Sequence, residues 1–466
     1  MELAARNVAR QCRPAHALAV CIVMLVMATS LSAVAATNWV TTWGASPQGP
    51  YPSGAAVAQP DLSFAFPNNV AVDQTFRLIV RPGMWSKTMR IHFTNLFGNQ
   101  PLTIDGIYVG LQKTGAAIVT GTNQPVSVNG RSSFTLQPGQ STWSDPMNLQ
   151  FVQGSGDDQG DQNNQGNDNG QGNDSNTASG MVGRKLAISF HTAGSTGPMT
   201  WHAKAMTTSY VTNQGAGSVG NTEGDVFPTS TTSWYFIDKI DMDLPKGTQL
   251  VVALGDSITD GTSSTINGDD RWPDVVARRL EAAYGSKVVL VNEGIGGNQI
   301  VGPAVYDPNH PVAGGPSAVE RLSRDVIGLS GVTAVIWHEG TNDVSAGTSS
   351  AAIEAGFVTV VQQLRAAIPG VRIVGTTITS EVGAAGNGGT PAAAAQRIAL
   401  NQYIKSSGLF DDVVDFYAVT TDPATGALKA QFVPNTSIGG AGDHVHPNRA
   451  GYLTMGNAVN LGVLVH

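Results

Sequence analysis

A serine placed directly after an apolar run is the first residue with chemical potential. Ser257 follows residues 249–254, a continuous apolar, strand-like run, after one Gly-Asp pair. A serine hydroxyl is a weak nucleophile unless a base accepts its proton, and the base needs a partner that fixes its tautomer. In a predicted loop near the end of the sequence, Asp443 stands three residues before His446. These residue types and this spacing indicate nucleophilic catalysis.

Two further polar segments also follow predicted strands. Residues 292–298 read N-E-G-I-G-G-N, and residues 340–343 read G-T-N-D. Ligands of an open parallel sheet bind beyond the carboxyl ends of its strands, so these segments and Ser257 should converge on one site. Acyl transfer needs hydrogen-bond donors for the developing oxyanion. A backbone N–H beside a glycine and the carboxamide of Asn342 are suitable donors.

Other titratable residues near these segments receive lesser roles. His444 competes with His446, but it stands next to Asp443 and would struggle to pair with that carboxylate while facing the serine. We therefore expect His444 on the surface or behind the reacting groups. We expect Asp256 to accept hydrogen bonds from loop amides and Asp343 to hold Asn342 in place. His338 is expected at the edge of the core, and no role is assigned to His202.

No metal or cofactor is expected. The nine histidines include neither an H-x₃-H nor an H-E-x-x-H pair. Asp443, His444 and His446 could hold a metal, but a serine mechanism already uses two of them. A G-x-S-x-G elbow is also absent from the sequence, which disfavours an α/β-hydrolase of that type.

The second half of the chain predicts alternating strands and helices. Helices are expected at residues 272–284, 317–329 and about 349–368, with a last one from about 448. Apolar strands are expected at residues 249–254, 287–291, 333–337, 372–378 and 413–416. Five such strands with intervening helices predict a doubly wound, flavodoxin-like α/β domain at residues 248–466, with a parallel sheet covered on both faces.

The first half predicts strands instead. Short alternating runs at residues 75–80, 88–93, 104–111, 186–190 and 209–211 are separated by Gly, Pro and Asn. This pattern predicts an antiparallel β-sandwich or jelly roll at residues 37–247. Residues 154–179 are low in complexity and rich in Gly, Asp, Asn and Gln, without calcium-loop spacing, and are expected to form a disordered surface loop.

The ordered motifs resemble a known family. Residues 251–258 read V-V-A-L-G-D-S-I and are similar to the first block of the SGNH (GDSL-like) hydrolases. The glycine-rich segment, G-T-N-D and D-x-x-H-P resemble its later blocks in family order, over roughly 200 residues. The resemblance implies Ser257 as nucleophile and first oxyanion donor, Gly297 and Asn342 as further donors, His446 as base and Asp443 as its carboxylate. Gly296 is adjacent to Gly297, and family spacing favours the latter.

The beginning of the chain resembles an export signal. Arg6, Arg10 and Arg13 precede an apolar stretch at residues 17–31, and Ala33-Val34-Ala35 supplies an A-x-A cleavage site. The apolar stretch is shorter than the ~20 residues of a membrane span, so cleavage is favoured over an anchor. A lipoprotein at Cys21 is disfavoured because that cysteine lies early in the stretch. Residues 1–36 are thus predicted to be a signal peptide, and the protein to be secreted or periplasmic.

Composition limits the partners. Both cysteines of the 466-residue chain lie in this leader, so disulfides are not expected beyond it. The net charge is −8 and basic blocks are absent from the sequence, which disfavours nucleic acid as a partner. The N-terminal half resembles the extension of secreted members related to xylan and other carbohydrate acetylesterases. That resemblance implies an ester substrate with a short acyl group, such as acetyl on a polysaccharide.

Two other functions remain open at this point. A carbohydrate-binding protein with a vestigial hydrolase scaffold would use the β-rich half alone, and the intact motif set argues against it. An O-acyltransferase would use the same residues with a sugar as acceptor. The oligomeric state is not predictable from the sequence.

Overall fold

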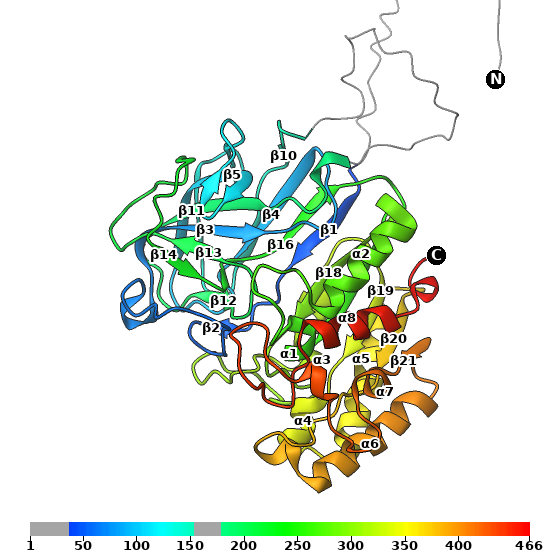
Figure 1. The fold of residues 1–466 in the computed structure, drawn as a ribbon. Helices are drawn as coiled ribbons and strands as arrows, with labels where there is room; N and C mark the ends of the chain where they lie inside the picture. Colours follow the sequence, from blue (N-terminus) through cyan, green and yellow to red (C-terminus); the bar gives the residue numbers. More distant parts are fainter. Residues whose placement is uncertain (1–36, 153–178) are drawn as a thin grey trace, which may run out of the picture. The chain divides into compact units, whose positions relative to one another are not determined.

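The computed structural model describes residues 37–152 and 179–466 (Figure 1). The predicted signal peptide lies outside the described residues, as does nearly all of the segment at 154–179. No helix within the described ranges is long and apolar enough to cross a membrane.

Residues 37–247 are rich in β-structure, as predicted. The strands are β1 (Trp39–Gly44), β2 (Gly49–Pro50), β3 (Val72–Val80), β4 (Thr88–Thr94), β5 (Leu102–Thr114), β6 (Ala117–Ile118), β7 (Gln124–Pro125), β8 (Ser133–Leu136), β9 (Ser141–Trp143), β10 (Met147–Asn148), β11 (Leu186–Ser195), β12 (Thr200–His202), β13 (Ser209–Val211), β14 (Thr229–Thr231), β15 (Trp234–Tyr235) and β16 (Ile237–Asp243). The five predicted runs all fall within these strands.

These strands form three antiparallel sheets. One has the order β1-β16-β4-β10, with β9 also paired to β4, and a second has the order β14-β13-β3-β11-β5-β6, with β7 and β8 on β5. The short third sheet is β15-β12-β2. Phe93 of the first sheet and Phe190 of the second pack with ring centroids 5.9 Å apart. The sandwich or jelly-roll interpretation of this half stays a prediction.

Strand β16 was not predicted from the sequence. Its pairing with β4 shifts register between Ile237 and Lys239, so the alternation of apolar and polar residues is interrupted. Polar residues of this strand, among them Asp241, are buried, which hides the usual strand pattern further.

The C-terminal half is α/β, as predicted. Its parallel sheet has the order β18-β17-β19-β20-β21, with β17 (Gln249–Gly255), β18 (Val288–Gly294), β19 (Val332–His338), β20 (Arg372–Thr376) and β21 (Asp412–Val414). The helices are α1 (Ser257–Asp260), α2 (Trp272–Tyr284), α3 (Ala318–Leu322), α4 (Thr341–Ser345), α5 (Ser350–Ala367), α6 (Pro391–Ser406), α7 (Phe416–Thr420) and α8 (Arg449–Ala458).

Alternate residues of β17 enter different cores, which is why the strand is apolar from Leu250 to Leu254. Val252 packs in a cluster with Phe357 of α5, whereas Val251 packs in another with Val276 of α2 and Met455 of α8. Helices therefore cover both faces of the sheet (Figure 1).

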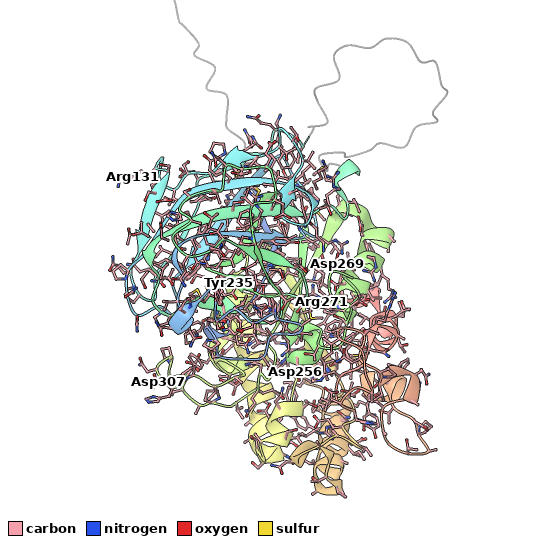
Figure 2. All side chains as sticks on the ribbon, turned by 60° about the vertical axis from the view of Figure 1, so that its left-hand side comes forward. Arg131, Tyr235, Asp256, Asp269, Arg271 and Asp307 are labelled. Carbon is pink, nitrogen blue, oxygen red and sulfur yellow. The ribbon has the colours of Figure 1, made fainter. Side chains whose placement is uncertain are left out.

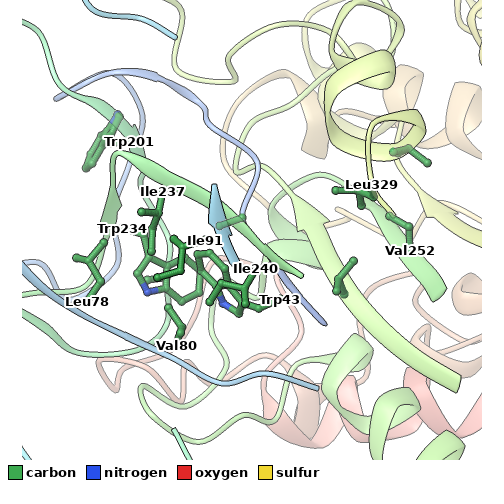
Figure 3. Packing of buried hydrophobic residues seen from close by; sticks show 14 of the residues in the cluster. Trp43, Leu78, Val80, Ile91, Trp201, Trp234, Ile237, Ile240, Val252 and Leu329 are labelled. Carbon is green, nitrogen blue, oxygen red and sulfur yellow. The ribbon is translucent and has the colours of Figure 1, made fainter. Parts of the chain in front are cut away.

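The first of these clusters continues into the β-rich half. Figure 3 shows Trp43 and Trp234 of that half in the same cluster as Val252 and Leu329. The backbone also joins the halves, because Thr41 of β1 donates its N–H to Ser330 O at 3.0 Å. The boundary at residue 247 stays a prediction, since residues on either side share one core.

Several predicted boundaries differ from the structure. The strand expected at 413–416 ends at Val414, because the Asp415 side chain accepts the N–H of Ala418 and caps α7. Helix α6 was missed, although Thr390 caps it and Pro391 begins it. The helix expected at 317–329 is α3 followed by a π-helical turn, Ser323–Ile327.

Candidate active site

Ser257 lies where β17 turns into α1. The Asp256 carboxylate, labelled in Figure 2, accepts the N–H of Ile258 at 2.9 Å and caps this helix, as expected of a residue bonded to loop amides. A Cβ on Gly255 would stand 2.2 Å from His338 O, so only glycine fits at the end of the strand. Ser257 is 6% exposed.

The structure brings Ser257 and His446 together from distant parts of the sequence. Ser257 Oγ lies 2.7 Å from His446 Nε2, and His446 Nδ1 lies 2.6 Å from Asp443 Oδ2. A serine hydroxyl is thus in reach of a base whose other ring nitrogen is held by a carboxylate. His446 is the histidine that faces the serine; His444, at φ 63°, follows Asp443 in a tight turn.

The Asp443 carboxylate is held ionised. Its side chain is 47% exposed. Partial burial alone would raise the pKa of Asp443, but hydrogen bonds from the His446 ring and from the backbone N–H groups of His446 and Val445 hold that pKa well below its ordinary value. An ionised carboxylate can stabilise the imidazolium that forms when His446 takes a proton.

Gly296 and Gly297 differ in what their amides do. The Gly296 N–H donates to Asp260 Oδ2 at 2.9 Å, so it is already used. Within the described residues, the Gly297 N–H makes no hydrogen bond, and Gly297 has a φ of 85°. Gly297 is therefore the better placed of the two to donate to an oxyanion.

Asn342 lies in the first turn of α4 and contacts the glycine-rich loop. Its Nδ2 donates to Asn298 O at 2.9 Å, which leaves its second N–H for another acceptor. Asp343, expected to brace Asn342, instead accepts the amides of Ile300 and Val301 at 2.8 and 3.2 Å. Burial raises the pKa of Asp343 to about 6.

Arg321 connects the site segments to one another and was not predicted from the sequence. Its buried guanidinium donates to Gly255 O at 2.9 Å, to Glu293 O at 2.8 Å and to Asn298 Oδ1 at 2.7 Å. These acceptors belong to the strand before the serine, to β18 and to the glycine-rich loop. An arginine within an expected helix carries no local signal for such a role, because its partners are far away in sequence.

His338 and His202 are both buried. His338 Nδ1 lies 2.7 Å from Thr376 Oγ1, and burial lowers the pKa of His338 to about 3, which keeps it neutral and agrees with a place in the core. His202, to which the sequence assigned no role, contacts the α/β half: its Nε2 lies 3.1 Å from Asp260 Oδ1.

No cluster of three or more potential metal ligands occurs in the part of the chain that the structure describes.

Comparison with known proteins identifies the region that contains these residues. Residues 253–453 match the model of the GDSL-like Lipase/Acylhydrolase family. This region is a GDSL-like acylhydrolase domain. Each candidate residue, from Ser257 to His446, lies inside it. No curated protein matches the chain.

Solved structures that resemble this chain have low sequence identity to it. A GDSL-like lipase from Bacteroides thetaiotaomicron is 18% identical, with 47% of this chain and 89% of that chain covered and a TM-score of 0.34. The inhibitor-bound aryl esterase of M. smegmatis is also 18% identical, with 47% and 100% covered and a TM-score of 0.34. A member of the lipolytic G-D-S-L family from Veillonella parvula is 18% identical, with 45% and 95% covered and a TM-score of 0.31.

Proposed function

We propose that the protein is a serine esterase that hydrolyses carboxylic esters through an acyl-enzyme on Ser257. The observation that carries this proposal is the chain of contacts from Ser257 Oγ to His446 Nε2, 2.7 Å, and from His446 Nδ1 to Asp443 Oδ2, 2.6 Å. The family of the domain, a lipase and acylhydrolase family, supports the same reaction class.

In the proposed reaction, Ser257 Oγ attacks the ester carbonyl while His446 Nε2 takes the hydroxyl proton. The carbonyl oxygen becomes an oxyanion that accepts hydrogen bonds from the N–H groups of Ser257 and Gly297 and from the Asn342 carboxamide. The C–O bond to the alcohol then breaks, and His446 returns the proton to the leaving alcohol. Water attacks the acyl-enzyme by the same steps, and the free acid leaves.

We further propose a short acyl group, acetyl on a polysaccharide in the first instance, and export of the protein. The substrate rests on the resemblance of the N-terminal half to carbohydrate acetylesterases. Export rests on the basic, apolar and A-x-A pattern of residues 1–36. The test of export is the intact mass of the protein recovered from the culture medium. We expect a mass that corresponds to a chain beginning near residue 37.

The test is hydrolysis of p-nitrophenyl esters of increasing chain length, together with acetylated xylan. We expect activity to be greatest on the acetyl ester and acetate to be released from the xylan. Ser257→Ala should abolish hydrolysis with an unchanged circular dichroism spectrum. Wild-type turnover in that variant would remove Ser257 from the mechanism.

A further inference from the structure

The peptide that joins Gly296 to Gly297 is held by side chains from outside its own loop. The carbonyl of this peptide, Gly296 O, accepts a hydrogen bond from Gln48 Nε2 at 3.2 Å. The N–H of Gly296, which belongs to the preceding peptide, donates to Asp260 Oδ2 at 2.9 Å. In a trans peptide, the carbonyl and the following N–H point in opposite directions. Gln48 therefore fixes the direction of the Gly297 N–H, the oxyanion donor of the proposed mechanism.

Gln48 is itself firmly placed. It is fully buried, and its Nε2 also donates to Ala313 O, so rotation of the amide would break two hydrogen bonds. Its backbone N–H donates to Trp201 O of β12 at 2.8 Å. A Cβ on Gly54 would stand 2.4 Å from Gln48 Nε2, so the chain leaves room for this amide.

Asp260, which holds the Gly296 N–H, is held in turn by His202. His202 Nε2 lies 3.1 Å from Asp260 Oδ1, and its Nδ1 lies 2.9 Å from Ser46 O. The imidazole stacks on Trp234, with centroids 5.5 Å apart and planes at 28°. Burial opposes protonation, but the charge of Asp260 and the hydrogen bonds raise the pKa of His202, which favours a buried ion pair.

Lys204 closes the same side of the loop. A Cβ on Gly296 would stand 2.3 Å from Lys204 Nζ, so the lysine packs directly against this glycine. Burial lowers the pKa of Lys204, and the charge of Asp260 opposes that change. The surroundings of Gly296 thus come largely from the β-rich half, although Gly296 itself belongs to the GDSL-like domain.

We infer that Gln48 and His202 are positioning residues for the oxyanion hole, so that the β-rich half completes the active site of the GDSL-like domain. This inference rests on the proposed function. Oxyanion donors act only when they are already aimed at the developing charge, and small misplacements are costly. Without Gln48, the Gly296 carbonyl loses a hydrogen bond that fixes the peptide carrying the Gly297 N–H. Without His202, Asp260, which accepts the Gly296 N–H, loses its contact to the imidazole.

The kinetic test uses the full chain and p-nitrophenyl acetate. We expect Gln48→Met and His202→Phe to lower kcat by about 10- to 100-fold, with KM within about 2-fold, because the lost interaction acts on the transition state. His202→Gln places an amide donor near Nε2 and should recover most of kcat, whereas His202→Asn should not. His191→Phe is the matched control: it removes another histidine–carboxylate pair, His191 with Asp105 and Asp73, whose contacts stay in the β-rich half.

A kcat within about 2-fold of wild type in both Gln48→Met and His202→Phe would overturn the inference. Equal kcat in His202→Gln and His202→Asn would show that His202 is not a positioning residue. If His202→Phe does not fold, the comparison of these two variants tests the role of His202.

A second readout does not depend on activity. Amide hydrogen exchange, followed by mass spectrometry over residues 294–299, should be about 10-fold faster in Gln48→Met and His202→Phe than in wild type, and unchanged in Ser257→Ala. Unchanged exchange in the first two variants contradicts the inference. If exchange is faster in Gln48→Met and His202→Phe but the wild-type protein hydrolyses no ester, the proposed esterase function is rejected. The role of Gln48 and His202 in holding the loop is then still supported.

Discussion

Asp443 holds His446 through both of its carboxylate oxygens. Oδ2 lies 2.6 Å from His446 Nδ1, while Oδ1 accepts the backbone N–H groups of His446 and Val445, each at 2.9 Å. The two backbone donors fix which oxygen faces the ring. The imidazole is thereby kept with Nδ1 protonated and Nε2 free to accept the Ser257 proton.

This geometry predicts a severe effect of Asp443→Asn. The backbone donors would hold the amide oxygen, so the new NH₂ group would face His446 Nδ1 and force the tautomer with Nε2 protonated. We expect kcat at neutral pH to fall by about 10⁴-fold, as when the triad carboxylate of a serine protease is replaced by its amide. The measurement is kcat for p-nitrophenyl acetate with Asp411→Asn as a control, and a loss below about 10-fold would contradict the tautomer argument.

Asn342→Ala removes a proposed oxyanion donor. We expect kcat to fall by about 10²- to 10³-fold with little change in KM, because the donor acts on charge that exists only in the transition state. The variant also loses the contact from Nδ2 to Asn298 O, so thermal unfolding must be measured beside the kinetics. An increase in KM with unchanged kcat would assign Asn342 to ground-state binding instead.

Arg321→Met should destabilise the fold. The guanidinium is buried and pairs with Asp325 at 3.1 Å, so its removal leaves a buried carboxylate short of a partner and several carbonyls without a donor. We expect a loss of about 3–5 kcal/mol in the free energy of unfolding, measured with urea. Arg365→Met, which breaks an exposed pair with Asp411, is the control and should cost below about 1 kcal/mol. Similar losses of unfolding free energy in the two variants would show that the buried contacts of Arg321 do not stabilise the fold more than an exposed ion pair does.

Glu339 should contribute stability that is lost as the pH rises toward neutrality. Burial raises the pKa of Glu339 to about 7, so the folded protein keeps a proton that the unfolded chain releases at its ordinary value near ~4.3. This contribution to stability is complete below that ordinary pKa and is lost as the pH passes through about 7. Asp343, with its pKa raised to about 6, acts in the same direction.

The lowered pKa of His338 acts in the opposite direction, because this histidine takes up a proton at pH 5 only when the chain unfolds. The decisive comparison is therefore between wild type and Glu339→Gln. The variant should lose the part of the urea midpoint that Glu339 adds at pH 5 relative to pH 8. The glutamine keeps an oxygen for the N–H of Trp337, which donates to Glu339 at 2.8 Å. The pKa of Asp443 is lowered, so its contribution to folding stability is lost only in more acidic solution. Asp443 therefore does not affect the comparison between pH 5 and pH 8. If the urea midpoint depends on pH equally in wild type and Glu339→Gln, Glu339 is not the group that keeps a proton in the folded protein.

The regular elements of the α/β half were largely predictable. Strand β17 is apolar from Leu250 to Leu254 because both of its faces are buried. Helix α5 shows a helical period bounded by Ser349 and Pro369. Helix α6 escaped prediction because its alanine-rich sequence has a weak apolar stripe. In the β-rich half, β16 escaped because the register shift and buried polar residues remove the alternation on which the prediction depends.

The sequence by itself determined which residues could react. Ser257, Asn342, Asp443 and His446 were selected by residue type, spacing and position after strands, and a local i, i+3 contact such as Asp443 with His446 is within reach of such reasoning. Only the tertiary structure decided that the Gly296 N–H is occupied and the Gly297 N–H is not. Only the tertiary structure brought Arg321, Gln48 and His202 to the site. Their hydrogen bonds join residues far apart in the chain, and the positions of such partners follow from the packing of two halves around a shared core, which leaves no periodicity in the sequence.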